Sequence, residues 1–192
     1  MPIGAALQAA LKGSLVLSCR APLAFPGGGG YRHFEGYSFD PAPAALEHQV
    51  AEAADRALEM CAWARRRHGV DKVAIWGFSQ GATIAWSCLC RRWPQGGQLD
   101  AAVCSSGVLL RDFCNAATPL GRELRPAAEG VGVLATHGTL DGTTPYELHE
   151  ETVARAEALL PALRVTRITR PDGHNVVAQQ ESVAWLAEAL GA

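Results

Sequence analysis

The stretch Val73-Ala74-Ile75-Trp76-Gly77-Phe78-Ser79-Gln80-Gly81 decides the fold of this chain. Its first four residues are an apolar run that predicts a buried β-strand, and the residues after Gly81 predict a helix. Gly-x-Ser-x-Gly between a strand and a helix is typical of a strained turn that lifts a serine hydroxyl above a sheet. We therefore expect Ser79 to be a nucleophile. The backbone N–H of Gln80, at the helix N-terminus, is expected to donate to an oxyanion.

Outward from this turn, strand and helix patterns alternate along the chain. Further strands are expected at 14–19, 101–104, 131–135 and 165–168, and helices at 44–68, 81–92, 145–160 and 176–190, with helical character also in 1–13. Continuous apolar strands that alternate with helices predict a mostly parallel sheet with helices on both faces. The expected fold is a single three-layer α/β/α domain over 1–192, with about five or more strands. Residues 20–43, rich in Pro and Gly, are expected to form a long loop.

A serine nucleophile needs a base and an acid that orients the base. Asp141 follows the strand expected at 131–135, and His174 follows the strand expected at 165–168. The order Ser, acid, His suits a nucleophile on such a turn, and all three positions fall where strands end. We expect Asp141 as the acid and His174 as the base. Asp172 is the alternative acid, but it lies only two residues from His174.

Composition excludes several other classes of function. The net charge is −2 and the pI is near 6.3, so the chain has no positive electrostatic field that would hold a nucleic acid. No apolar window is long enough to cross a bilayer, and the opening residues lack a basic region before their apolar stretch, so we expect a cytoplasmic protein. The six cysteines show neither a disulfide framework nor zinc spacing. Neither a metal nor a cofactor is expected.

These motifs resemble those of the phospholipase/carboxylesterase family of α/β-hydrolases, which includes the acyl-protein thioesterases. Gly77 to Gly81 resembles the family's nucleophile motif, His137-Gly138-x-x-Asp141 its acid loop, and Gly173-His174 its histidine motif. Ser105-Ser106-Gly107 resembles a segment that lies beside the family's pocket. The resemblance implies an α/β-hydrolase fold and a small, cofactor-independent serine hydrolase that acts on carboxylic esters or thioesters.

The chain departs from that family before Ser14. Members normally begin with a further strand whose loop supplies a second oxyanion donor, and residues 1–13 look like the helix after it. The oxyanion hole is then expected to keep only the Gln80 N–H. We further expect the strands at 14–19 and 73–76 to pair directly, or a second copy of the chain to fill the gap as a homodimer.

Four further residues are candidates for lining a substrate pocket, namely Tyr31, Phe78, Ser106 and Phe113. The aromatic members would suit a modest hydrophobic acyl or aryl group. Three alternative functions stay open at this point. They are a dienelactone-hydrolase-like enzyme, a catalytically weakened hydrolase fold that only binds, and an acyltransferase that uses the same three residues.

Overall fold

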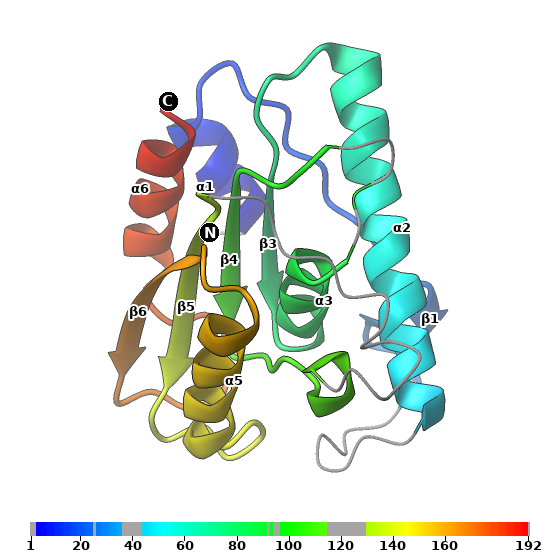
Figure 1. Cartoon of the computed structure of the whole chain (residues 1–192), viewed down its shortest axis with the longest axis vertical. Coiled ribbons are helices and arrows are strands. Elements are labelled where there is room, and N and C mark those ends of the chain that lie inside the picture. Colours follow the sequence, from blue (N-terminus) through cyan, green and yellow to red (C-terminus); the bar gives the residue numbers. More distant parts are fainter. Residues whose placement is uncertain are drawn as a thin grey trace.

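A computed structural model describes residues 3–24, 26–35, 44–91, 93, 97–114 and 130–191. Its central element is a parallel four-stranded sheet in the order β3-β4-β5-β6. The strands are β3 (Ala74–Phe78), β4 (Ala101–Ser105), β5 (Gly132–Gly138) and β6 (Arg164–Arg170). The expected α/β fold class is confirmed (Figure 1), although this sheet has four strands among the described residues rather than the expected five or more.

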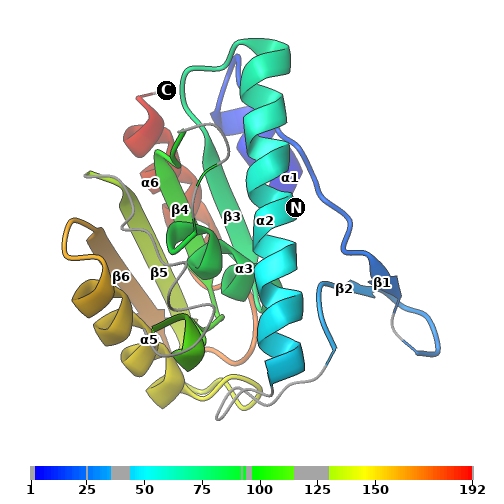
Figure 2. The same ribbon diagram turned by 45° about the vertical axis from the view of Figure 1, so that its right-hand side comes forward.

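Helices cover both faces of this sheet. On one face lie α2 (Ala44–His68), α3 (Gln80–Leu89) and α5 (Tyr146–Leu159), and on the other lie α1 (Ile3–Ala10) and α6 (Gln179–Leu190). The two layers are separated by the sheet in Figure 2. The helix expected at 44–68 has these bounds in the structure, and the other expected helices are present with ends shifted by a few residues, as helix termini usually are.

The core is divided between the two faces by the alternation of side chains along each strand. In β4, Ala102 and Cys104 pack toward α2, α3 and α5, whereas Ala101 and Val103 pack toward α1 and α6. All five residues of β4 are buried. Such two-sided burial explains why the central strands are continuous apolar runs rather than alternating ones.

The prediction of a strand at 14–19 is wrong. Those residues form a coil that runs from α1 to the next elements without joining the sheet (Figure 1), and Leu15 and Leu17 are 44% and 41% exposed. Direct pairing of this segment with β3 is therefore also wrong, and β3 is an edge strand of the four-stranded sheet. An apolar run becomes a strand only when a second backbone supplies a hydrogen-bond ladder. Here Val16 instead packs on the α1 and α6 side of the core, and the thiol of Cys19 lies 3.5 Å from the sulfur of Met60.

Part of the expected long loop is a small hairpin. Strands β1 (Leu23–Ala24) and β2 (Tyr31–Arg32) pair antiparallel, and Gly27 to Gly29 turn the chain between them with φ near +86°. Only glycine adopts such angles without strain. The hairpin projects to the side of the lower half of α2 (Figure 2). Residues 25 and 36–43 of the expected loop lie outside the described part of the chain.

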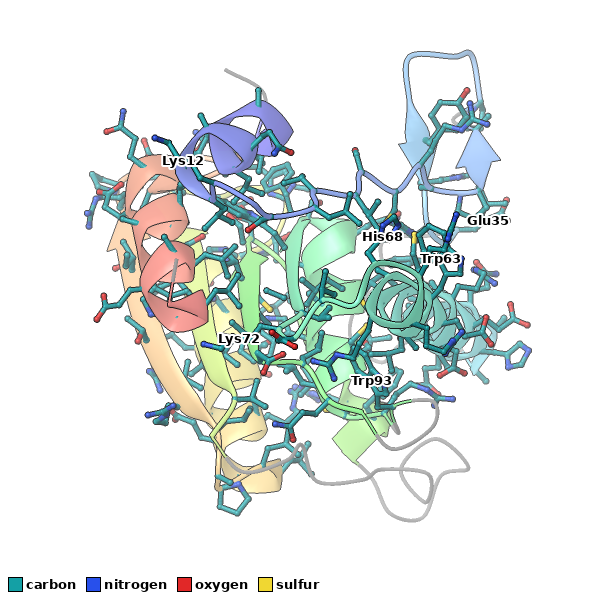
Figure 3. All side chains as sticks on the ribbon, turned by 90° about the horizontal axis from the view of Figure 1, so that it is seen from above. Lys12, Glu35, Trp63, His68, Lys72 and Trp93 are labelled. Atoms are coloured by element: carbon teal, nitrogen blue, oxygen red, sulfur yellow. The ribbon has the colours of Figure 1, made fainter. Side chains whose placement is uncertain are left out.

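Long-range contacts tie the N-terminal end of the sheet to its neighbours. The ammonium of Lys72, just before β3, donates to the carbonyl of Leu190 at the end of α6, at 2.9 Å. The guanidinium of Arg65 on α2 donates to Oδ2 of Asp100, just before β4, at 3.1 Å. Lys72 is labelled in Figure 3, which looks down on the sheet from above. The candidate site residues follow the opposite, carboxyl ends of the strands.

Candidate active site

Ser79 stands on a strained turn between β3 and α3. Its φ and ψ are 54° and −120°, a conformation that non-glycine residues rarely adopt and that costs on the order of 1–3 kcal/mol. The Ser79 N–H donates to the carbonyl of Ser105 at 2.9 Å, which fastens the turn to the end of β4. The first helical N–H groups of α3 have no intrahelical acceptor, so the Gln80 N–H is free of the helix ladder.

Of the two motif glycines, only Gly77 is required for the close approach of β3 and α3. A Cβ on Gly77 would lie 2.0 Å from the carbonyl oxygen of Gly81, whereas a Cβ on Gly81 would meet nothing within 4 Å. A third glycine matters here, because a Cβ on Gly107 would lie 2.6 Å from the Ser79 carbonyl oxygen. The turn therefore depends on Gly77 and Gly107, and the motif pattern identified only the first of these.

His174 lies in the loop between β6 and α6 and faces Ser79. Its Nε2 atom is 2.9 Å from Ser79 Oγ, and its Nδ1 atom is 2.7 Å from Asp141 Oδ2. The Phe78 ring lies 5.0 Å from the imidazole, centroid to centroid. The next residue, Asn175, accepts a hydrogen bond of 3.4 Å from the hydroxyl of Ser106 through its backbone carbonyl. The histidine loop is thereby attached to the end of β4.

Asp141 is held by the backbone that follows it. Its Oδ1 atom accepts hydrogen bonds of 2.8 Å from the N–H groups of Thr143 and Thr144, and its side chain has no solvent exposure. Burial raises the pKa of Asp141. The bonds from Thr144, His174 and Thr143 outweigh that effect, so the pKa lies below its ordinary value of 3.8. Asp141 thus stays a carboxylate beside His174.

The neighbouring loops explain why Asp141, rather than Asp172, reaches the imidazole. The Leu140 N–H donates to the backbone carbonyl of Asp172 at 3.0 Å, and a Cβ on Gly138 would lie 2.2 Å from that same oxygen. The acid loop and the histidine loop are therefore packed backbone to backbone. This close approach brings the Asp141 side chain to Nδ1 of His174 from the other loop.

The side chain of Gln80 has a function that its sequence pattern did not reveal. Its Oε1 accepts from the His33 N–H at 2.9 Å, and its Nε2 donates to the Phe34 carbonyl at 3.1 Å. Phe34 is fully buried. Both ends of one amide thus clamp the segment after β2 onto the turn that carries Ser79. A glutamine after a serine gives no signal of such a distant contact.

The four pocket candidates lie at different depths. Phe78 is partly exposed beside His174, and Ser106 is fully buried with a φ of 52° at the end of β4. Phe113 is fully buried in the core within the short 3-10 helix η2 (Arg111–Cys114). Tyr31 is 51% exposed on the hairpin, with the Arg20 guanidinium 4.8 Å above its ring. Of the four, Phe78 and Ser106 contact the histidine loop directly.

Among the described residues, the chain has neither a metal-binding cluster nor a membrane-spanning helix. Within the described residues, no group of three or more His, Cys, Asp or Glu side chains is arranged to hold a metal ion. In that part, too, no helix combines the length and the apolar character needed to cross a membrane.

Comparison with solved structures places this geometry in a known fold. The Bacillus cereus carboxylesterase superimposes with a TM-score of 0.69 at 20% identity, over 95% of this chain and 80% of that one. The Zea mays acyl-protein thioesterase 2 superimposes with a TM-score of 0.64 at 20% identity, over 98% of this chain and 89% of that one. A phospholipase/carboxylesterase from Dyadobacter fermentans superimposes with a TM-score of 0.60 at 18% identity, over 83% of this chain and 71% of that one.

The likeness is one of structure rather than of sequence. No protein-family model matches the chain, and no curated protein matches its sequence. The structural match extends over nearly the full chain and to esterases and thioesterases alike. The chain therefore has the α/β-hydrolase fold of those enzymes.

Proposed function

We propose that this chain is a serine hydrolase that cleaves carboxylic esters or thioesters through an acyl-enzyme intermediate. The observation that carries the proposal is the continuous contact from Ser79 Oγ to His174 to the buried carboxylate of Asp141. A serine hydroxyl becomes a useful nucleophile when an imidazole can take its proton and a carboxylate fixes the imidazole. Nucleophile, base and acid here come from three separate loops at one edge of the sheet.

The reaction begins with proton transfer from Ser79 to Nε2 of His174 as Oγ attacks the carbonyl carbon. The carbonyl π electrons move to oxygen, and the resulting oxyanion accepts a hydrogen bond from the Gln80 N–H. Collapse of the tetrahedral intermediate breaks the bond to the leaving alcohol or thiol, which takes the proton from His174. Asp141 stabilises the imidazolium and keeps Nδ1 protonated throughout.

The second half of the reaction releases the acid. His174 removes a proton from water as the water oxygen attacks the acyl carbon, and it then returns that proton to Ser79 Oγ. The products are the carboxylic acid and the regenerated serine. A small ester with a good leaving group, such as p-nitrophenyl acetate, is a suitable first substrate. Its hydrolysis depends less than that of other esters on stabilisation of the oxyanion.

A fluorophosphonate probe tests the proposal without knowledge of the substrate. Such a probe phosphonylates a serine only when a neighbouring base activates it. We expect mass spectrometry to find the label on Ser79, and Ser79→Ala and His174→Ala to abolish labelling while the chain stays folded. Labelling at another serine, or none in the folded wild-type chain, would overturn the assignment.

A further inference from the structure

Two buried histidines lie behind the acid loop and take no part in the proposed reaction. His137 on β5 and His149 on α5 are 0% and 1% exposed, and their rings lie 4.7 Å apart, centroid to centroid. The ring of Tyr146 lies 6.0 Å from His137 and 5.7 Å from His149. Burial of two imidazoles costs free energy unless their ring nitrogen atoms are hydrogen-bonded.

The hydrogen bonding of His137 fixes the position of its proton. Its Nε2 is 2.8 Å from the backbone carbonyl of Thr144. A carbonyl oxygen can only accept, so Nε2 carries the hydrogen. Burial lowers the pKa of His137 more than the Thr144 carbonyl and Asp141 raise it, so the ring is neutral and Nδ1 is unprotonated. In the described part of the chain Nδ1 indeed has no partner.

Thr144 connects this imidazole to the proposed catalytic acid. Its carbonyl accepts from His137, and its N–H donates to Asp141 Oδ1 at 2.8 Å. The direct distance from His137 Nε2 to Asp141 Oδ2 is 3.6 Å, which is too long for a hydrogen bond. His137 therefore acts on Asp141 through the backbone of Thr144 rather than by contact.

We propose that His137 is a positioning residue that anchors the Thr144 peptide and so aims the Asp141 carboxylate at His174. The inference rests on the proposed function, because it assigns a role toward the acid of that reaction. The relay runs from the His137 imidazole through the Thr144 backbone and the Asp141 carboxylate to the His174 imidazole. Loss of its first member releases the peptide that holds Oδ1 in place.

The charged and titratable groups around His137 come from two loops, one helix and one strand. They are Asp141 in the acid loop, His174 in the histidine loop, Tyr146, His149 and Glu150 on α5, and Arg167 on β6. Burial, followed by the charges of His137 and Arg167, lowers the pKa of His149 to about 3. The imidazole stack thus stays uncharged, and the carboxylate of Asp141 has His174 as its one imidazole hydrogen-bond partner among the described residues.

Three variants separate positioning from a merely structural role. His137→Leu removes the donor, His137→Gln keeps an N–H near the position of Nε2, and His149→Leu alters the same stack without removing a hydrogen bond of the relay. We expect kcat of His137→Leu to fall by up to about 100-fold with KM unchanged, because a misplaced catalytic group costs about that much. His137→Gln should recover most of the loss, and His149→Leu should keep the wild-type kcat.

Carbon NMR of the Asp141 carboxyl gives a readout that needs no turnover. Loss of the Thr144 donor should raise the pKa of Asp141 in His137→Leu but not in His149→Leu. In the wild-type chain, nitrogen NMR at about pH 8 should find His137 neutral and protonated on Nε2. This last measurement tests the positioning role even if His137→Leu fails to fold, because protonation on Nδ1 would overturn that role.

The outcomes distinguish this inference from the proposed function. A folded His137→Leu with wild-type kcat and an unchanged Asp141 titration would overturn the positioning role, as would a wild-type His137 protonated on Nδ1. A wild-type chain without Ser79-dependent hydrolysis would overturn the proposed function. The Asp141 titration would then still show whether His137 holds the carboxylate in place.

Discussion

The Nε2 atom of His174 lies 2.9 Å from the Oγ atom of Ser79, although the two residues are 95 positions apart in the chain. The register of the sheet explains this approach. Phe78 on β3 is paired with Ser105 on β4, and Ser105 with Thr136 on β5. All strands are parallel, so their carboxyl ends meet at one edge. The residues that follow each strand are therefore brought together by the fold itself.

Asp141→Asn should lower kcat by up to about 10⁴-fold, because an amide N–H facing Nδ1 would favour the wrong imidazole tautomer. The Asn oxygen would still accept from Thr143 and Thr144, so the loop should hold its position. Ester hydrolysis by the purified variant measures the effect. Asp172→Asn is the matched control, and equal losses in the two variants would contradict the assignment of the acid.

Substitution of the two motif glycines should have opposite effects. In Gly77→Ala the new Cβ would lie 2.0 Å from the Gly81 carbonyl oxygen, so we expect destabilisation above about 4 kcal/mol or failure to fold. In Gly81→Ala the new Cβ meets nothing, and alanine should stabilise α3 by up to about 1 kcal/mol. Urea unfolding followed by tryptophan fluorescence compares the two. A stable Gly77→Ala chain would contradict the geometry of the turn.

Gln80→Ala should loosen the segment after β2 while leaving the backbone N–H of residue 80 in place. Loss of the bonds to His33 and Phe34 should cost about 1–3 kcal/mol of unfolding free energy, because the Phe34 carbonyl is buried. Hydrolysis should weaken in parallel if this segment borders the site.

The matched control for Gln80 is Gln49. Its side-chain oxygen accepts from the Glu35 N–H on the same segment, at an exposed position. Gln49→Ala should therefore change the unfolding free energy by no more than about 0.5 kcal/mol. Similar losses in both variants would show that the Gln80 amide has no special role as a clamp.

The buried imidazole of His149 should make the folded chain sensitive to acid. Burial, His137 and Arg167 lower its pKa to about 3, so below its ordinary value of 6.5 the unfolded chain binds a proton that the folded chain does not. The free energy of unfolding should therefore fall as the pH drops from 6.5 toward 3, by at most about 1.4 kcal/mol per unit. Unfolding at several pH values should give a shallower slope for His149→Leu. Parallel curves for the two proteins would contradict this account.

The sequence was sufficient to predict the helices, four of the strands and the order of the candidate site residues. Ser79, Asp141 and His174 could be predicted as a candidate site because the turn pattern and the strand ends are local features of the chain. The run at 14–19 has the same apolar character as the true strands, but strand formation depends on a distant partner that local composition does not encode. The clamp made by Gln80 and the close approach at Gly107 are contacts between remote segments, for which a single sequence carries no signal.

The most direct test of the central claim is the pre-steady-state release of p-nitrophenol from p-nitrophenyl acetate. An acyl-enzyme on Ser79 predicts an initial burst stoichiometric with the wild-type chain, followed by slower turnover. The Ser79→Ala chain, shown to be folded by its circular dichroism and thermal unfolding, should give neither burst nor turnover above background. Turnover of Ser79→Ala at the wild-type rate would contradict the account.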